Sequence, residues 1–94
     1  MGKGGSGEPA VVKKSLYSPG QQKVADSIRS MRLAAKLTQR GLAARLKRPL
    51  NVVSRIEAAQ RRVDLLEWVA LCEACGVNPV EGGRKLLDSL VHRR

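Results

Sequence analysis

The sequence predicts an all-α fold of five short helices that follow an N-terminal tail. Apolar residues recur at intervals of three and four, patterns typical of helix caps recur along the chain, and strand-like alternation of apolar and polar residues is absent. A chain of 94 residues is long enough for one small domain with a modest core. We expect a disordered, Gly-rich and basic tail over residues 1–17, and one helical domain over residues 18–94.

The first helix is expected to begin at Ser18, which is a suitable N-cap residue. Pro19 fits the first helical position, and Gln21 has the spacing to close a capping box with Ser18. The apolar residues that follow at helical spacing are Val24, Ile28, Met31 and Ala35.

Two very short helices are expected next. Thr38 is the expected cap of a helix over about residues 38–46, and Pro49 fits the first turn of a helix over about residues 49–57. The residues expected to face inward from this pair are Leu42, Ala43, Leu46, Val53 and Ile56.

Asp64 and Glu67 have the spacing of a second capping box, which predicts the start of a fourth helix. Gly76 is expected to end it, and Asn78-Pro79 to open the fifth. The expected apolar face of the fourth helix is Leu65, Trp68, Val69, Cys72 and Cys75. The corresponding face of the fifth is Val80, Leu86, Leu87, Leu90 and Val91.

The distribution of charge indicates a nucleic-acid partner. The formal net charge is +10, and residues 1–19 supply only +2 of it (three Lys against one Glu). Residues 36–62 hold eight Lys or Arg and one acid, Glu57. A basic face on a folded helix pair favours a polyanion. Tyr17 and Trp68 are the only aromatic residues, which favours duplex DNA over single strands that stack on exposed rings.

The residues resemble the lambda repressor and Cro type of helix-turn-helix regulator, the xenobiotic-response-element family. The similarity extends from about residue 17 to about residue 87. It is carried by the joint spacing of Leu37-Thr38-Gln39, Leu42-Ala43, Leu46, Val53-Ser54-Arg55-Ile56-Glu57, Arg61-Arg62, Asp64-Leu65 and Gly76-Val77-Asn78-Pro79.

The resemblance implies that helix 49–57 enters the major groove while helix 38–46 lies across the backbone. Arg55 would pair with guanine and Asn51 with adenine, whereas Leu50 would touch a thymine methyl. Arg32 and Glu57 match the family's structural pair between two helices. The implied base readers are Leu50, Asn51, Ser54 and Arg55. The implied backbone contacts are Gln39, which would also brace a side chain of the reading helix, Arg40, Lys47, Arg48, Arg61 and Arg62.

The chain departs from the family pattern at several helix ends. Family members usually have Gly where this chain has Lys36, Lys47 and Ala59. If these residues keep a left-handed backbone, each costs roughly 1 kcal/mol. Gly41, inside helix 38–46, costs about as much relative to Ala.

Cys72 and Cys75 form a Cys-x-x-Cys pair, which raises the question of a redox or metal site. Such a redox pair is expected at a helix start, whereas these two lie late in a helix on its apolar face. A metal site needs about four ligands, and the one histidine is His92 near the end of the chain. We therefore expect buried structural thiols, no metal, no cofactor and no enzymatic activity.

The predicted function is that of a sequence-specific double-stranded DNA-binding transcriptional regulator, most simply a repressor. The alternative is an antitoxin or another partner-binding protein on the same scaffold, with a protein partner at the C-terminal helix or at the segment holding Val11, Val12, Leu16 and Tyr17. We expect a homodimer, because one small domain reads only a few base pairs. No apolar run is long enough for a membrane span and no signal peptide is recognisable. The expected location is a bacterial or phage-like cytoplasm, at the nucleoid.

Overall fold

The computed structural model describes residues 18–91, and the predicted tail over residues 1–17 lies outside them. Within the described residues the fold is all-helical, as predicted. The helices are α2 (Pro19–Ala34), α3 (Gln39–Leu46), α4 (Leu50–Glu57), α5 (Leu65–Ala74) and α6 (Pro79–Val91).

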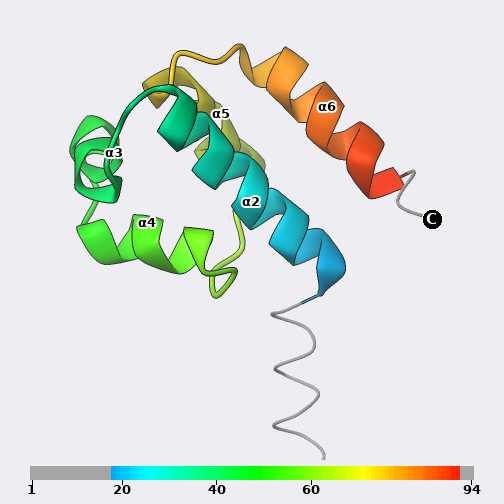
Figure 1. Cartoon of the computed structure of the whole chain (residues 1–94), viewed down its shortest axis with the longest axis horizontal. Coiled ribbons are helices and arrows are strands. Elements are labelled where there is room, and N and C mark those ends of the chain that lie inside the picture. Colours follow the sequence, from blue (N-terminus) through cyan, green and yellow to red (C-terminus); the bar gives the residue numbers. More distant parts are fainter. Residues whose placement is uncertain (1–17, 92–94) are drawn as a thin grey trace, which may run out of the picture.

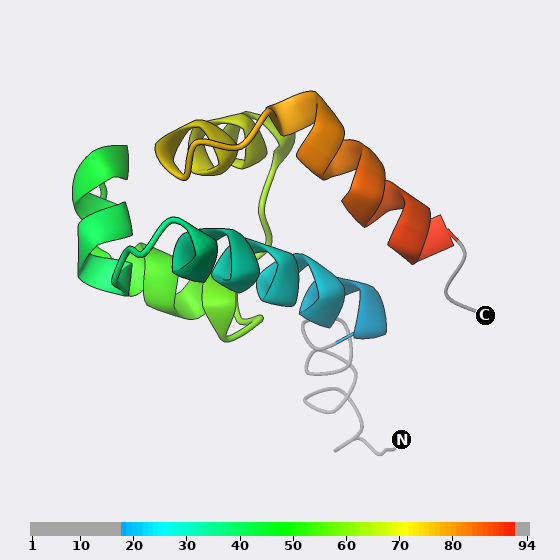
Figure 2. The ribbon, with the colours of Figure 1, turned by 45° about the horizontal axis from the view of Figure 1, so that its top comes forward.

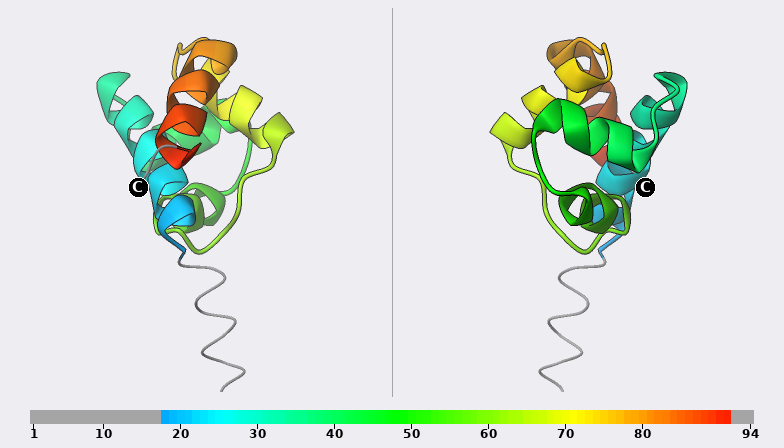
Figure 3. Two further views of the ribbon diagram at one scale, coloured as in Figure 1. Left: turned by 90° about the vertical axis from the view of Figure 1, so that its right-hand side faces the viewer. Right: turned by 90° about the vertical axis from the view of Figure 1, so that its left-hand side faces the viewer.

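The helices divide the molecule into two ends. The short helices α3 and α4 pack on each other at one end, and α6 lies at the other, with α2 between α4 and α6 (Figures 1 and 2). Figure 3 views the two ends in turn, with α6 in front in one panel and the α3–α4 pair in front in the other. Helix α5 contacts α2, α3 and α6, so it links the two ends.

The core lies where α2, α3, α4 and α5 meet. Each helix contributes at least one side chain that solvent does not reach, and these are Ile28, Leu42, Val53, Leu71 and Cys72. Burying an aliphatic side chain of this size stabilises the fold by about 1.5–3 kcal/mol. Of the five predicted inward residues of the short helices, all are buried except Leu46, which is half-buried. The core therefore fixes the position of both short helices.

Four of the predicted helix starts are capped by side chains. Ser18 and Thr38 each accept a hydrogen bond from the backbone N–H three residues ahead, at 3.1 and 2.9 Å. Asp64 and Glu67 form the predicted reciprocal box, with bonds of 2.7 and 3.2 Å. The Asn78 side chain accepts from the N–H groups two and three residues ahead. These caps satisfy backbone donors that have no partner within the helix.

Two details of the predicted starts were wrong. Gln21 does not close a capping box, because its buried side chain donates to the carbonyl of Arg61 at 3.1 Å. Pro49 is the N-cap and not the first helical residue. The proline ring fixes only φ, here −61°, and a ψ of 150° leaves the residue extended. Helix α4 therefore begins at Leu50 without a side-chain cap.

Four helices end in the same left-handed turn, at Lys36, Lys47, Ala59 and Gly76, with φ between 57° and 74°. In each, the N–H of the left-handed residue bonds to the carbonyl three residues back, and the next N–H bonds to the carbonyl five residues back. This is the Schellman arrangement. Three of the four positions carry a Cβ, so the backbone geometry expected for glycine is kept without it.

The predicted apolar faces of the last two helices were partly wrong. Leu65 and Val69 of α5 are exposed, whereas Leu71, which the prediction omitted, is buried. In α6, Val80, Leu87 and Val91 are 60–76% exposed. The spacing identified an amphipathic face correctly, but it could not show that one part of that face turns away from the domain.

The junction of α5 and α6 is close. Trp68 donates from Nε1 to the carbonyl of Pro79 at 3.1 Å. A Cβ added at Gly83 would lie 3.2 Å from the same nitrogen, and one at Gly82 would lie 3.1 Å from Val77 Cγ1. The two glycines therefore let α6 approach the indole ring closely.

Candidate nucleic-acid interface

Helices α3 and α4 form a compact helix-turn-helix unit. The chain turns between the two helices over residues 47–49, where Lys47 has a φ of 57° and Pro49 is extended. The N–H of Arg48 bonds to the Ala43 carbonyl at 3.1 Å, which closes the end of α3. The turn is therefore held by backbone hydrogen bonds, and side chains at its positions remain available for other contacts.

The predicted base readers lie along one side of α4. Asn51 and Arg55 are four residues apart and exposed, so they share a face of the helix. Leu50 and Ser54 lie beside them and are half-buried. Val53 and Ile56 occupy the opposite, buried side. The arrangement presents an amide, a guanidinium and an apolar side chain to the outside of one short helix.

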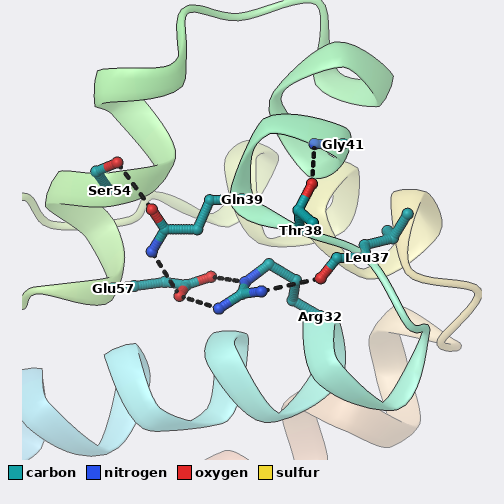
Figure 4. A network of polar contacts seen from close by, with 7 residues as sticks. All are labelled: Arg32, Leu37, Thr38, Gln39, Gly41, Ser54 and Glu57. Atoms are coloured by element: carbon teal, nitrogen blue, oxygen red, sulfur yellow. Dashed lines mark hydrogen bonds and ion pairs between the residues drawn. The ribbon is translucent and has the colours of Figure 1, made fainter.

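A polar network fixes the angle between α2, α3 and α4 (Figure 4). Arg32 donates to both oxygens of Glu57, at 2.7 and 3.0 Å, and to the carbonyl of Leu37. Gln39 donates to Glu57 at 3.0 Å and accepts from the Ser54 hydroxyl at 2.9 Å. The side chains of Arg32 and Glu57 are 10% and 3% exposed. The hydrogen bonds that Arg32 donates to Glu57 raise the pKa of Arg32 above its usual value, so the guanidinium stays charged.

Ser54, which the resemblance implies is a base reader, also belongs to this network. Its hydroxyl donates to Gln39 on the neighbouring helix. The contact of Gln39 with the reading helix was expected. The resemblance does not say which side chain Gln39 braces, and the structure shows two, Glu57 and Ser54.

The predicted backbone cations differ in how they are held. Arg40 and Lys47 are exposed, as is Arg62. Arg61 donates to the Glu67 carboxylate at 2.7 Å, and Arg48 lies 3.6 Å from the same oxygen. Sequence reasoning read Glu67 only as part of a helix cap. Its ion pairs with Arg48 and Arg61 could not be predicted, because they depend on which loops lie beside the start of α5.

One of the eight basic residues between positions 36 and 62 makes a structural contact between two helices. Arg45 donates to the carbonyl of Ala74, at the end of α5, at 2.8 Å. A basic group is favourable at this position because it faces the negative end of a helix. Arg45 therefore joins α3 to α5.

The two cysteines are buried free thiols, as expected. Burial raises the pKa of the Cys72 thiol to about 11, and it raises the pKa of Cys75 as well. Cys72 also lies 3.8 Å from the sulfur of Met31. Among the described residues, no group of three or more His, Cys, Asp or Glu side chains is arranged to hold a metal.

The fold and this interface define the class as a helix-turn-helix domain, in which the second helix of the pair is presented for recognition. Residues 24–82 match the family described as helix-turn-helix domain. The chain is 36% identical to an XRE-family like protein from Pseudomonas syringae pv. tomato, with a TM-score of 0.71 over 82% of this chain and 94% of that one. The chain therefore belongs to the XRE family of helix-turn-helix proteins, which confirms the resemblance.

Restriction-modification controller proteins share the fold. One match is the C.Esp1396I tetramer in complex with its 35 base-pair operator, at 23% identity, a TM-score of 0.69, and coverage of 79% of this chain and 97% of that one. Another is C.AhdI from Aeromonas hydrophila, at 29% identity and a TM-score of 0.61, covering 66% of this chain and 94% of that one. A search of curated proteins found no match. None of the described helices is both long enough and apolar enough to span a membrane.

Proposed function

We propose that this chain is a sequence-specific double-stranded DNA-binding transcriptional regulator, and that it represses by occupying a promoter. The observation that carries the proposal is the exposed face of α4, held in a helix-turn-helix unit by the buried Arg32–Glu57 pair. A helix that is held in place and presents hydrogen-bonding and apolar side chains outward can read base edges in the major groove. The action is binding and not catalysis, and its place is the cytoplasm, at the nucleoid.

Within α4 we assign base reading to the outward side chains. Arg55 is suited to a bidentate pair with guanine, and Asn51 to one with adenine. Leu50 supplies an apolar surface for a thymine methyl. We keep Ser54 among the base-reading residues, at the edge of this face, where its bond to Gln39 at 2.9 Å also orients the Gln39 amide.

We assign phosphate contacts to the side chains that surround α4. Gln39 uses one amide hydrogen for Glu57 and has a second for a phosphate. The cations at both ends of the helix supply charge but no sequence information. The assigned backbone set is Gln39, Arg40, Lys47, Arg48, Arg61 and Arg62.

Selection of random duplex DNA by the purified protein, followed by sequencing, tests the proposal directly. The expected result is a short enriched motif, bound with a log–log salt slope near −5 for about six phosphate contacts. Enrichment of no motif, or binding that does not change between low and moderate salt, would refute it.

We also propose that the protein acts as a homodimer through the groove between α5 and α6. The groove is lined by Trp68 and by exposed apolar side chains, namely Leu65, Val69, Val80, Leu87 and Val91. An exposed apolar surface of this kind marks an interaction site. A second copy is the favoured occupant, because the related C.Esp1396I binds its operator as a tetramer and because paired half-sites need two reading helices.

Sedimentation of the wild type and of Leu87→Glu tests the homodimer. The wild type is expected to sediment as a dimer at micromolar concentration, and the variant as a folded monomer with weaker operator binding. A wild type that is monomeric both free and on operator DNA would overturn the assignment.

A further inference from the structure

Glu67 holds two cations that the proposed function assigns to the DNA backbone. Its Oε2 accepts from Arg61 Nη2 at 2.7 Å, and Arg48 Nη2 lies 3.6 Å from the same oxygen. Arg48 precedes α4 and Arg61 follows it. The Glu67 carboxylate on α5 therefore lies close to two guanidinium groups, one from the segment before α4 and one from the segment after it.

The position of Glu67 is fixed independently of the two arginines. Its Oε1 accepts from the N–H of Asp64 at 3.2 Å, and its own N–H donates to the Asp64 carboxylate at 2.7 Å. The side chain is 18% exposed, whereas Arg61 and Arg48 are 29% and 45% exposed. The helix cap thus holds the carboxylate in place, and the carboxylate is less exposed than either arginine.

A carboxylate and a phosphate use the same guanidinium donors. The N–H groups of arginine bind both anions with the same planar geometry, and a charge-assisted bond to one competes with a bond to the other. In the free protein, the Glu67 oxygen lies 2.7 Å from Arg61 Nη2 and 3.6 Å from Arg48 Nη2, so these guanidinium groups already face an anion.

We propose that Glu67 is an internal competitor of the DNA backbone, and that it sets the affinity and salt dependence of binding through Arg48 and Arg61. This inference rests on the proposed function. DNA must displace the carboxylate or share the guanidinium groups with it, so part of the phosphate attraction is cancelled within the protein. Because phosphate contacts carry no sequence information, Glu67 lowers binding to operator and to other DNA by a similar factor.

The variant Glu67→Gln tests this without removing the helix cap, because glutamine also serves in a capping box. We expect several-fold tighter binding to operator and to random duplex DNA. The wild-type slope should fall short of the value near −5 expected when every assigned contact reaches a phosphate. The variant should steepen it toward that value by about 1–2, since each phosphate contact contributes about 0.9. Thermal unfolding of the variant shows whether the fold is kept.

A matched control separates the contact from net charge. Glu81 on α6 lies 3.7 Å from Arg84, and both side chains are well exposed. Glu81→Gln changes net charge by the same amount as Glu67→Gln, yet it should leave the affinity and the salt slope nearly unchanged. In a background carrying Arg48→Gln and Arg61→Gln, Glu67→Gln should also have no effect.

Three outcomes would overturn the inference. Weaker binding by Glu67→Gln would mean that the carboxylate orients the arginines for DNA. An equal gain in the control or in the arginine-free background would mean simple charge repulsion. An unchanged salt slope would mean that neither arginine meets a phosphate. All three require a wild type that binds DNA, so failure of the proposed function is seen first and separately.

Discussion

Replacing Lys36 or Lys47 by glycine should stabilise the protein. Both residues have left-handed backbone angles, with φ of 61° and 57°, and both side chains are exposed. A left-handed residue with a Cβ costs about 1–2 kcal/mol relative to glycine. Glycine in turn costs about 0.5–1 kcal/mol through the greater freedom of the unfolded chain. The difference is a gain of about 0.5–1 kcal/mol in the free energy of unfolding at each site.

Chemical denaturation, followed by the fluorescence of Trp68, measures this gain. For a domain of this size, 1 kcal/mol corresponds to about 4–8 °C in Tm. Lys47→Ala is the matched control, because it removes the charge and keeps the Cβ. It should leave the stability within about 0.5 kcal/mol of the wild type.

The two glycine variants should differ in DNA binding. Lys47 is an assigned phosphate contact, so Lys47→Gly should flatten the salt slope by about 0.9, whereas Lys36→Gly should not change it. Destabilisation by both glycine variants, or equal stabilisation by Lys47→Ala, would refute the argument from backbone strain.

Three further predictions concern single side chains. Arg55→Ala should cost about 1–3 kcal/mol of operator binding and relax the preference at one base pair; a uniform loss across all sequences in a binding assay would contradict base reading. Arg32→Ala should destabilise the fold by about 3–5 kcal/mol in urea titration, because it leaves Glu57 buried without its cationic partner; a loss below 1 kcal/mol would contradict this. For Cys72, whose folded pKa is raised from 9.0 to about 11, the buried thiol stabilises fully below about pH 9. The unfolding free energy should fall as the pH rises from about 9 toward 11, and a Cys72→Ala variant that shows the same fall would rule out this thiol as the cause.

The helices and their ends were predictable because their causes are local. Capping residues such as Thr38 and Asp64 act within three positions along the chain, and Gly76 ends a helix through its own backbone angle. The left-handed turns at Lys36 and Lys47 were predictable from the family pattern, although these residues do not favour such turns themselves.

Contacts between distant segments were harder to predict. The ion pairs of Glu67 with Arg48 and Arg61 depend on where two loops meet the start of α5. The turn of Ser54 toward Gln39 depends on the angle between α3 and α4. The exposure of Leu65 depends on the direction in which α6 leaves α5. Periodicity reports which residues share a helix face, and it does not report which part of that face another helix covers.

The sequence of helix α6 can change more freely than that of α4 without loss of the fold. None of its residues is fully buried, and it packs on the domain through Gly82 and Gly83 beside Trp68 and through the half-buried Leu86. The α4 side is fixed by the buried Arg32–Glu57 pair and tolerates little change. After gene duplication, two copies could therefore diverge along α6 until they no longer assemble with each other, while both still recognise the same DNA.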